Sequence, residues 1–196
     1  MKFLFDLGGV FFDWDPKYFF RNIFKNSEEM QYFLENICNH EWNIKQDAGR
    51  LIKDAEYELI NKYPEHQKLI KMYYSNHRKM IRGTYKNSID ILNELNNSSF
   101  ECYVLSNWSS ETFRGMIQDY PFLKKFDGMV ISGDVKLVKP DPNIYFFAIK
   151  KFKLIPNETV FIDDKLDNIN AAKVIGFKTI HLKDPSIIKE LIKKYI

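Results

Sequence analysis

The chain has 196 residues, of which 45% are hydrophobic and 28% charged, proportions that are ordinary for a folded globular protein. The 29 basic and 26 acidic residues give a formal charge of +3, and the lysine pairs are scattered, which argues against a nucleic-acid groove. The N-terminal apolar run reaches Asp6, so it is too short for a signal peptide or a membrane span. The cysteines, Cys38 and Cys102, lie far apart, as in a protein of a reducing compartment. We therefore expect a cytoplasmic protein that contacts neither nucleic acid nor membrane.

Short apolar runs alternate with longer helical patterns, which predicts a parallel sheet covered by helices on both faces. The strands are expected at residues 2–5, 101–105, 129–132, 159–162 and 178–182. Asp-Pro pairs at 141–142 and 184–185 predict helix starts, and Gly176 predicts a helix end. Ser109 or Ser110 is expected to cap a helix that runs toward Tyr120.

One long segment, from about Asp15 to Arg82, shows helical periodicity and no convincing strand. Asp15-Pro16 and Ser27-Glu28-Glu29 mark helix starts there, and Pro64 interrupts the pattern. We interpret this segment as a helical insert placed directly after the first strand. The predicted fold is a doubly wound, Rossmann-like α/β core of residues 1–14 and 84–196 with a small helical cap of residues 15–83.

Reactive side chains follow the predicted strands at their carboxyl ends, the edge where open parallel sheets bind ligands. They are Asp6 after the first strand, Ser106 and Asn107 after the second, and Asp163 and Asp164 after the fourth. Lys139 precedes the helix start at Pro140-Asp141-Pro142. Acids and a lysine at one edge predict a site for a hard divalent cation and an anionic substrate.

The order of these motifs resembles the haloacid-dehalogenase-like (HAD) superfamily. The matching segments are Phe5-Asp6-Leu7-Gly8-Gly9-Val10, Leu105-Ser106-Asn107, Lys139-Pro140-Asp141-Pro142 and Phe161-Ile162-Asp163-Asp164. The resemblance covers the whole chain, because the helical insert lies where that family places a small cap. Within the superfamily, the glycine at position 8, the length and the cap resemble bacterial sugar-1-phosphate phosphatases.

The resemblance implies a hydrolase in which Asp6 attacks a phosphate ester and forms an aspartyl intermediate that water then hydrolyses. It implies that Ser106 and the Asn107 backbone hydrogen-bond the transferred phosphoryl group, and that Lys139 neutralises its charge. The substrate is expected to be a small phosphorylated metabolite such as a sugar phosphate. The protein is expected to be a monomer or a homodimer.

The same resemblance implies Mg²⁺ as the cofactor. Its ligands would be Asp6, the carbonyl of Gly8 and Asp164, with Asp163 and Asn168 in supporting positions. Oxygen ligands with few protein carboxylates are the set that Mg²⁺ prefers, since water and phosphate oxygens complete its coordination.

Position 8 departs from the family pattern. Most phosphatases of the superfamily carry a second aspartate there, which protonates the leaving alcohol, whereas this chain has Gly8. General acid catalysis contributes about 10²–10⁴ in rate, so the difference needs an explanation. Three remain open: a leaving group that departs without a proton, such as an anomeric sugar oxygen; a proton from a cap residue or water; or a halide leaving group.

Two other functions are compatible with the fold. A metal-independent 2-haloacid dehalogenase fits the missing acid, but the Asp163-Asp164 pair argues against it, because such enzymes need no concentrated negative charge beside the nucleophile. A catalytically weak binding protein is less consistent with the intact set of motifs. Detectable turnover of a phosphate ester distinguishes an enzyme from a binding protein.

The remaining candidates have simpler structural explanations. The histidines at 40, 66, 77 and 181 are scattered and lack the spacing of metal ligands. Four further side chains could face the substrate, although a structural role is the simpler interpretation of each: Trp14, Asp47, Arg50 and Trp108.

Overall fold

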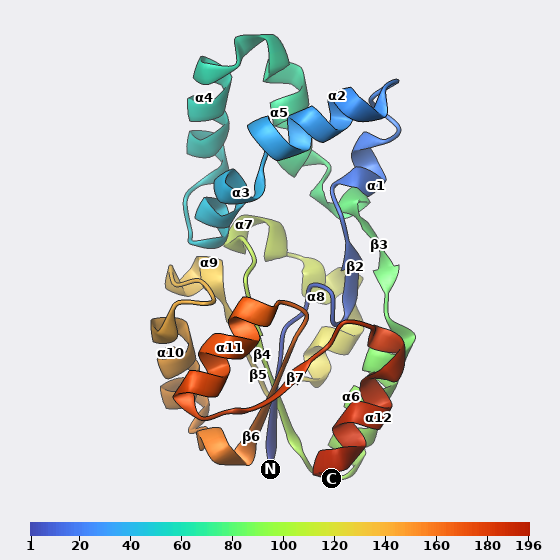
Figure 1. The fold of residues 1–196 in the computed structure, drawn as a ribbon, viewed down its shortest axis with the longest axis vertical. Helices are drawn as coiled ribbons and strands as arrows, with labels where there is room; N and C mark the ends of the chain where they lie inside the picture. Colours follow the sequence, from blue (N-terminus) through green and yellow to red (C-terminus); the bar gives the residue numbers. More distant parts are fainter.

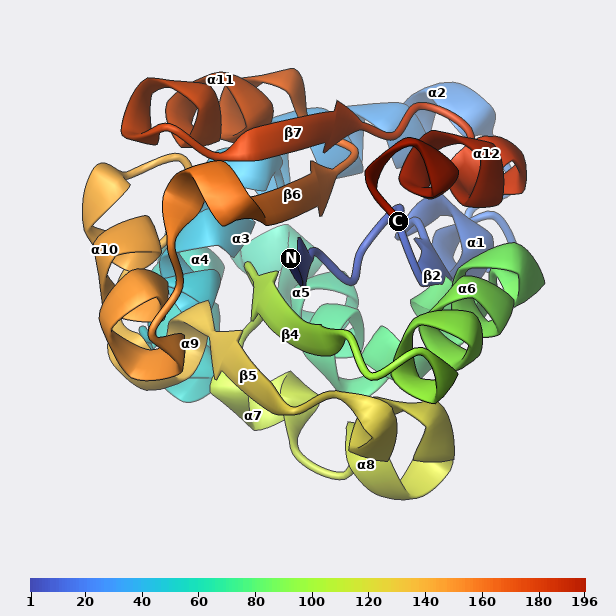
Figure 2. The same cartoon turned by 90° about the horizontal axis from the view of Figure 1, so that it is seen from below.

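Five parallel strands form the central sheet in the order β5-β4-β1-β6-β7, which Figure 2 shows from below. They are β1 (Lys2–Phe5), β4 (Glu101–Ser106), β5 (Gly128–Ile131), β6 (Thr159–Asp163) and β7 (Lys178–His181). The computed structural model describes residues 1–196. Each predicted strand is present within one residue of its expected bounds, and the predicted doubly wound α/β fold is confirmed.

Alternate side chains of β1, β4, β5 and β6 enter two separate hydrophobic cores, one on each face of the sheet. Leu4 and Phe161 pack against α10 (Pro142–Phe152) and α11 (Leu166–Ile175). Phe5 and Ile162 pack against α6 (Lys86–Asn97) and α12 (Ile188–Ile192). These helix pairs cover opposite faces (Figure 2). Burial on both faces explains why the strands are nearly continuous apolar runs, each large side chain contributing about 1.5–3 kcal/mol.

Residues 15–80 form a helical layer, called the cap below, over the carboxyl ends of the strands (Figure 1). Its helices are α1 (Lys17–Phe20), α2 (Ser27–Tyr32), α3 (His40–Asp47), α4 (Ile52–Lys62) and α5 (Gln67–Ser75). The predicted helix starts and the interruption at Pro64 are confirmed. The cap has a hydrophobic core of its own, which includes Phe20, Phe33 and Tyr73. The division into domains at residues 14/15 and 83/84 stays a prediction.

Two short strands join the cap to the sheet. β2 (Phe12–Trp14) and β3 (Ile81–Thr84) pair in antiparallel fashion, so the expectation of no strand as far as Arg82 is wrong. An ion pair of 2.5 Å between Arg82 Nη2 and Asp13 Oδ2 also links the two strands. The chain enters the cap through β2 and leaves it through β3. Because these two strands are paired, they anchor one side of the cap next to the sheet.

The remaining helices are short. The helix predicted from Ser109 or Ser110 toward Tyr120 is broken into α7 (Ser110–Phe113) and α8 (Met116–Asp119). The break lies at Gly115, whose φ of 80° is left-handed and ends the first segment. The last short helix, α9 (Ser132–Val135), follows β5. None of the helices combines the length and the apolar character that crossing a lipid bilayer requires.

The predicted helix signals around the site are confirmed. The Asp141 side chain accepts a hydrogen bond from the Asn143 amide at 2.8 Å, and Asp184 does the same for Ser186. Gly176 closes α11 with a φ of 101°. Asp184 opens a 3₁₀ turn that leads into α12, so this start lies one short turn before the helix proper.

Candidate active site

Three neighbouring strands bring the predicted side chains to one edge of the sheet. β1 leaves the sheet at Asp6, β4 ends at Ser106, and β6 ends at Asp163. Because β4, β1 and β6 are adjacent and parallel, their carboxyl ends meet. The structure therefore gathers side chains that lie up to about 160 positions apart in the sequence.

Asp6 has two chemically different carboxylate oxygens. Oδ1 accepts hydrogen bonds from the Leu7 amide at 2.7 Å and from Ser106 Oγ at 2.6 Å. Lys139 Nζ lies 3.1 Å from the same oxygen. Oδ2 has no protein donor. Burial raises the pKa of Asp6 to about 7, opposed by the charge of Lys139 and reinforced by Asp163 and Asp164. The side chain is thus oriented through one oxygen, which leaves the other free.

Lys139 is held in place from both its side chain and its backbone. Its ammonium group is buried between Asp163 Oδ2 at 2.6 Å and Asp6 Oδ1. The Asn107 side chain accepts from the Lys139 amide at 2.8 Å and donates to the Lys139 carbonyl at 2.9 Å. The pKa of Lys139 is raised, because the carboxylates outweigh the cost of burial. The Asn107 side chain therefore acts through Lys139, and only its backbone is left for an anionic substrate.

The two neighbouring acids have different surroundings. Both oxygens of Asp163 are occupied by donors: Lys139 Nζ, the Lys165 amide at 2.8 Å, and Asn168 Nδ2 at 3.0 Å from each oxygen. Asp164 is half-buried, and its side chain pairs only with the exposed Lys165 at 3.0 Å. Asp163 therefore positions Lys139, whereas Asp164 keeps oxygen lone pairs for another ligand.

The carboxylates fit a divalent cation. One oxygen from each of Asp6, Asp163 and Asp164 lies within 4.8 Å of the others. Three carboxylates face a single buried lysine, so negative charge is in excess at this edge. An all-oxygen donor set with excess negative charge suits Mg²⁺ better than a thiolate-seeking or imidazole-seeking metal. Asp6 and Asp164 are the side chains with free oxygens to hold it.

Replacing Gly9 by alanine is expected to weaken metal binding. Gly9 has a φ of +67°, and an added Cβ would lie 2.6 Å from Asp164 Cγ, so the Asp164 carboxylate must move. Displaced supporting groups typically cost about 10–100-fold in metal affinity. Calorimetric titration with Mg²⁺ measures the loss. Gly83→Ala is the control, since a Cβ there meets nothing within 4 Å; equal affinities for the two variants would contradict the expectation.

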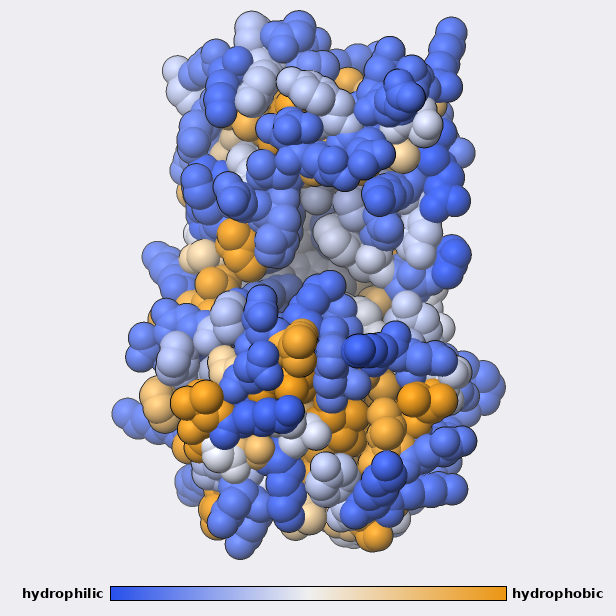
Figure 3. Space-filling view, viewed as in Figure 1, coloured by the Kyte–Doolittle hydropathy of each residue, from blue (hydrophilic) through white to orange (hydrophobic).

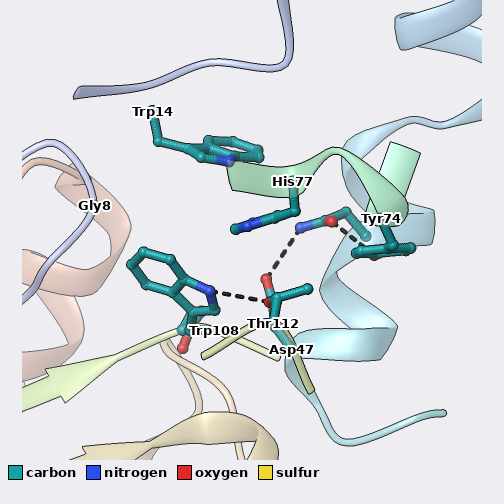
Figure 4. A pocket seen from close by; sticks show the side chains of 9 residues that line it. Gly8, Trp14, Asp47, Tyr74, His77, Trp108 and Thr112 are labelled. Carbon is teal, nitrogen blue, oxygen red and sulfur yellow. Dashed lines mark hydrogen bonds between the residues drawn. The ribbon is translucent and has the colours of Figure 1, made fainter. Parts of the chain in front are cut away.

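A pocket of about 90 Å³ lies between the sheet edge and the cap. The molecular surface is hollowed where the two parts meet (Figure 3). The lining residues from the sheet edge are Gly8, Asn107, Trp108 and Thr112, and those from the cap and its connection are Trp14, Asn43, Asp47, Tyr74 and His77. Figure 4 shows the rings of Trp14, His77 and Trp108 turned toward one another. A ligand bound here would contact both parts of the molecule.

The weaker candidates separate in the structure. Trp14, Asp47 and Trp108 line the pocket, whereas Arg50 is bound to Gln46 and Glu58. His77 also lines the pocket, although no spacing signal in the sequence distinguishes it from the other histidines. Burial lowers the pKa of His77 to about 4, and the charge of Arg78 adds to this, so the ring is neutral at neutral pH.

Comparison with known proteins finds phosphatases and dehalogenases among the relatives. Sesquiterpene phosphatase astK from Aspergillus oryzae is 26% identical over 182 residues, which are 92% of this chain and 89% of that protein. (S)-2-haloacid dehalogenase 1 from Pseudomonas sp. is 28% identical over 141 residues, 72% of this chain and 59% of that protein. D-ribitol-5-phosphate phosphatase from Bacteroides thetaiotaomicron is 35% identical over 89 residues, 41% and 42% of the two chains.

Solved structures share the fold over nearly the whole chain. A HAD family enzyme from Bacteroides thetaiotaomicron has a TM-score of 0.75 with 22% identity and covers 97% of both chains. The same enzyme in complex with magnesium and inorganic phosphate has a TM-score of 0.69 with 22% identity, and covers 91% of this chain and 92% of that one.

The family model described as haloacid dehalogenase-like hydrolase matches residues 4–182. This range contains every motif from Asp6 to Asp164 and the whole cap. The chain therefore belongs to the haloacid dehalogenase-like hydrolase family.

Proposed function

We propose that this protein is a Mg²⁺-dependent phosphomonoester hydrolase that acts on a small metabolite, such as a sugar phosphate, through an aspartyl-phosphate on Asp6. The observation that carries the proposal is the free Oδ2 of Asp6 beside a buried lysine and a pair of further acids. Two relatives named as phosphatases support it. A neighbour in fold that binds magnesium and phosphate together supports the cofactor.

In this mechanism the Asp6 carboxylate attacks phosphorus, and Ser106 and Lys139 hold this carboxylate in place through their contacts with Oδ1. The Lys139 ammonium offsets charge on the phosphoryl oxygens, and the Ser106 hydroxyl and the Asn107 backbone orient them. The ester oxygen leaves, and water then attacks phosphorus, which returns Asp6 as a carboxylate. Asp163 and the Asn107 side chain act indirectly: Asp163 binds the Lys139 side chain, and Asn107 binds the Lys139 backbone.

When bound, Mg²⁺ would supply positive charge that offsets the negative charge of the phosphate and of Asp6. Asp6, Asp164 and the Gly8 carbonyl would hold it. The cap would exclude water from the attack, and the pocket beside Gly8 would contact the leaving group. Occurrence in the cytoplasm and a monomeric or dimeric state stay predictions.

A second candidate, 2-haloacid dehalogenation, is favoured by one observation: a relative with 28% identity over 141 residues is named as such a dehalogenase. The acid cluster opposes it. In that reaction Asp6 would displace the halide from carbon and form an ester, a step that needs no metal. Asp164 would then add repulsion near the nucleophile with no compensating role.

Parallel assays separate the two candidates. Purified protein is given p-nitrophenyl phosphate or 2-chloropropionate, each with Mg²⁺ and with EDTA. The proposal predicts release of p-nitrophenol with Mg²⁺ only and no chloride release under either condition. The p-nitrophenolate ion leaves without being protonated, so the missing acid at Gly8 cannot explain a negative result. Chloride release at the same rate with Mg²⁺ and with EDTA would favour the dehalogenase. No detectable product in any of the four assays would favour a binding protein.

A further inference from the structure

The site contains no acid at position 8 to protonate a leaving alcohol, and this inference rests on the proposed phosphatase function. A Cβ added at Gly8 would meet nothing within 4 Å, so the missing side chain leaves open space beside the nucleophile. Gly8 lines the pocket that the cap closes. A side chain that protonates a leaving alcohol would therefore come from another part of the site, and the cap supplies the other wall of this pocket.

We propose that Asp47, at the end of cap helix α3, is the general acid that protonates the leaving oxygen. Asp47 lines the same pocket as Gly8 and Asn107. Figure 4 shows Asp47 beside Thr112, close to the His77 and Trp108 side chains. The residue belongs to the cap, whereas the nucleophile belongs to the sheet, so the acid is in place only when the cap lies over the edge.

The other polar groups of the pocket are poor donors. The Tyr74 hydroxyl donates its proton to Asn43 Oδ1 at 2.8 Å, and the Trp108 indole donates to Thr112 Oγ1 at 3.1 Å. The Thr112 hydroxyl lies within 3.3 Å of the Ser109 carbonyl. His77 is neutral at neutral pH, and an uncharged imidazole is a weak acid. Asp47 is thus the pocket residue whose side chain can supply an acidic proton.

Hydrogen bonds fix the Asp47 side chain. Asn43 Nδ2 donates to Asp47 Oδ2 at 3.2 Å, and no side chain donates to Oδ1. Asn43 is oriented by Tyr74, whose hydroxyl accepts from Gln46 Nε2 at 2.9 Å. This chain of amides and hydroxyls runs into the buried core of the cap. The Asn43 side chain and the Ser109 backbone amide therefore fix the orientation of the carboxyl group that carries the proton.

Burial and the negative charge of Asp6 favour the protonated form of Asp47. Burial raises its pKa to about 7, the backbone amide of Ser109 opposes this, and the negative charge of Asp6 adds to the rise. The titratable groups that face it are Asp6 from the sheet edge and the neutral side chains of Tyr74 and His77 from the cap. No lysine or arginine lines the pocket to hold it ionised.

The proton balance closes over one turnover. The Asp6 carboxylate forms a bond to phosphorus, the bond from phosphorus to the ester oxygen breaks, and the Asp47 proton passes to that oxygen to give the alcohol. Water then attacks the aspartyl-phosphate and gives a proton to the Asp47 carboxylate. The bond between phosphorus and Asp6 breaks, and phosphate leaves. The same residue acts first as a general acid and then as a general base, so its protonated form is restored after each turnover.

The test uses aryl phosphates whose leaving phenols differ in acidity. In Asp47→Asn, kcat for phenyl phosphate is expected to fall by about 10²–10⁴-fold, and kcat for p-nitrophenyl phosphate by much less, because nitrophenoxide leaves unaided. The decline of kcat at pH above about 7 in the wild-type protein with phenyl phosphate is expected to vanish in the variant. Asp54→Asn, an exposed aspartate of the same cap, is the matched control.

A second variant separates proton donation from a structural role. Gly8 has room for a side chain and no left-handed φ, so Gly8→Asp can place a carboxyl group beside the leaving oxygen. The double variant Gly8→Asp/Asp47→Asn is expected to have a kcat for phenyl phosphate at least about tenfold higher than that of Asp47→Asn alone. Equal losses for both esters in Asp47→Asn, or a change in KM alone, would overturn the proposal, as would a failure of Gly8→Asp to restore any rate.

The thermal stability of Asp47→Asn gives a readout that is independent of turnover. A carboxyl group with a raised pKa stabilises the fold below its ordinary pKa and loses that contribution as pH rises through about 7. In EDTA, the variant is expected to melt above the wild-type protein at about pH 8 and close to it at about pH 5. A Tm difference that does not depend on pH would contradict a protonated Asp47. If the wild-type protein hydrolyses neither ester, the proposed phosphatase itself fails.

Discussion

Asp6→Asn is expected to lower kcat for p-nitrophenyl phosphate by about 10⁴-fold or more, since removal of a covalent nucleophile typically costs this much. Asparagine has the same shape and can still accept from Ser106, so the fold should be retained. Steady-state hydrolysis with saturating Mg²⁺ measures the loss.

The same variant is expected to be more stable than the wild-type protein in EDTA at neutral pH and above. Burial raises the pKa of Asp6 to about 7, so ionising it costs stability as pH rises through that value. Removing the charge also relieves repulsion from Asp163 and Asp164. Asp167→Asn, an exposed aspartate near the site in α11, is the control for both measurements. A variant that keeps kcat within tenfold would contradict the assigned nucleophile.

Lys139→Met is expected to destabilise the protein by about 3–5 kcal/mol, the cost of breaking a buried ion pair from one side. The Lys139 side chain is wholly buried between Asp6 and Asp163, and methionine leaves both carboxylates without their cation. In a chain of this length the change lowers Tm by about 10 °C. Urea unfolding in EDTA at neutral pH gives the free energy directly.

Two further variants identify the source of that loss. Lys165→Met removes an exposed partner of Asp164 and is expected to cost less than about 1 kcal/mol, as surface ion pairs do. Combining Lys139→Met with Asp163→Asn removes both ends of the buried pair, so the double variant should be more stable than Lys139→Met alone. A loss below about 1 kcal/mol for Lys139→Met would show that the buried pair is not what holds this edge together.

The sheet and its reactive edge could be predicted because each feature is local in the sequence. A strand such as β6 is an apolar run that ends in acids, and the edge of a parallel sheet then brings Asp163 beside Asp6 without further assumptions. The Asp-Pro pair at Asp141 was predictive for the same reason, since capping depends on neighbouring residues alone.

Features that depend on distant contacts were missed. β2 and β3 are three and four residues long, too short for a clear alternation, and they become strands only by pairing with each other across the cap. Nothing in the sequence around Gly115 indicates a helix end, and only its left-handed φ in the structure shows that the expected helix is broken there. His77 was not distinguished from the other histidines, whereas Asp47 was one of four side chains that could face the substrate. Both reach the pocket because the cap folds over the sheet edge, a placement that no spacing in the sequence indicates.

The central claim, a covalent phosphoryl group on Asp6, is tested most directly by acid-quenching the wild-type protein during turnover of p-nitrophenyl phosphate with Mg²⁺. Mass spectrometry of the digest then locates the label. The proposed mechanism predicts one phosphoryl group on the peptide that contains Asp6, removed by hydroxylamine and absent from Asp6→Asn. Turnover with no label on that peptide, or a label on Ser106 instead, would contradict it.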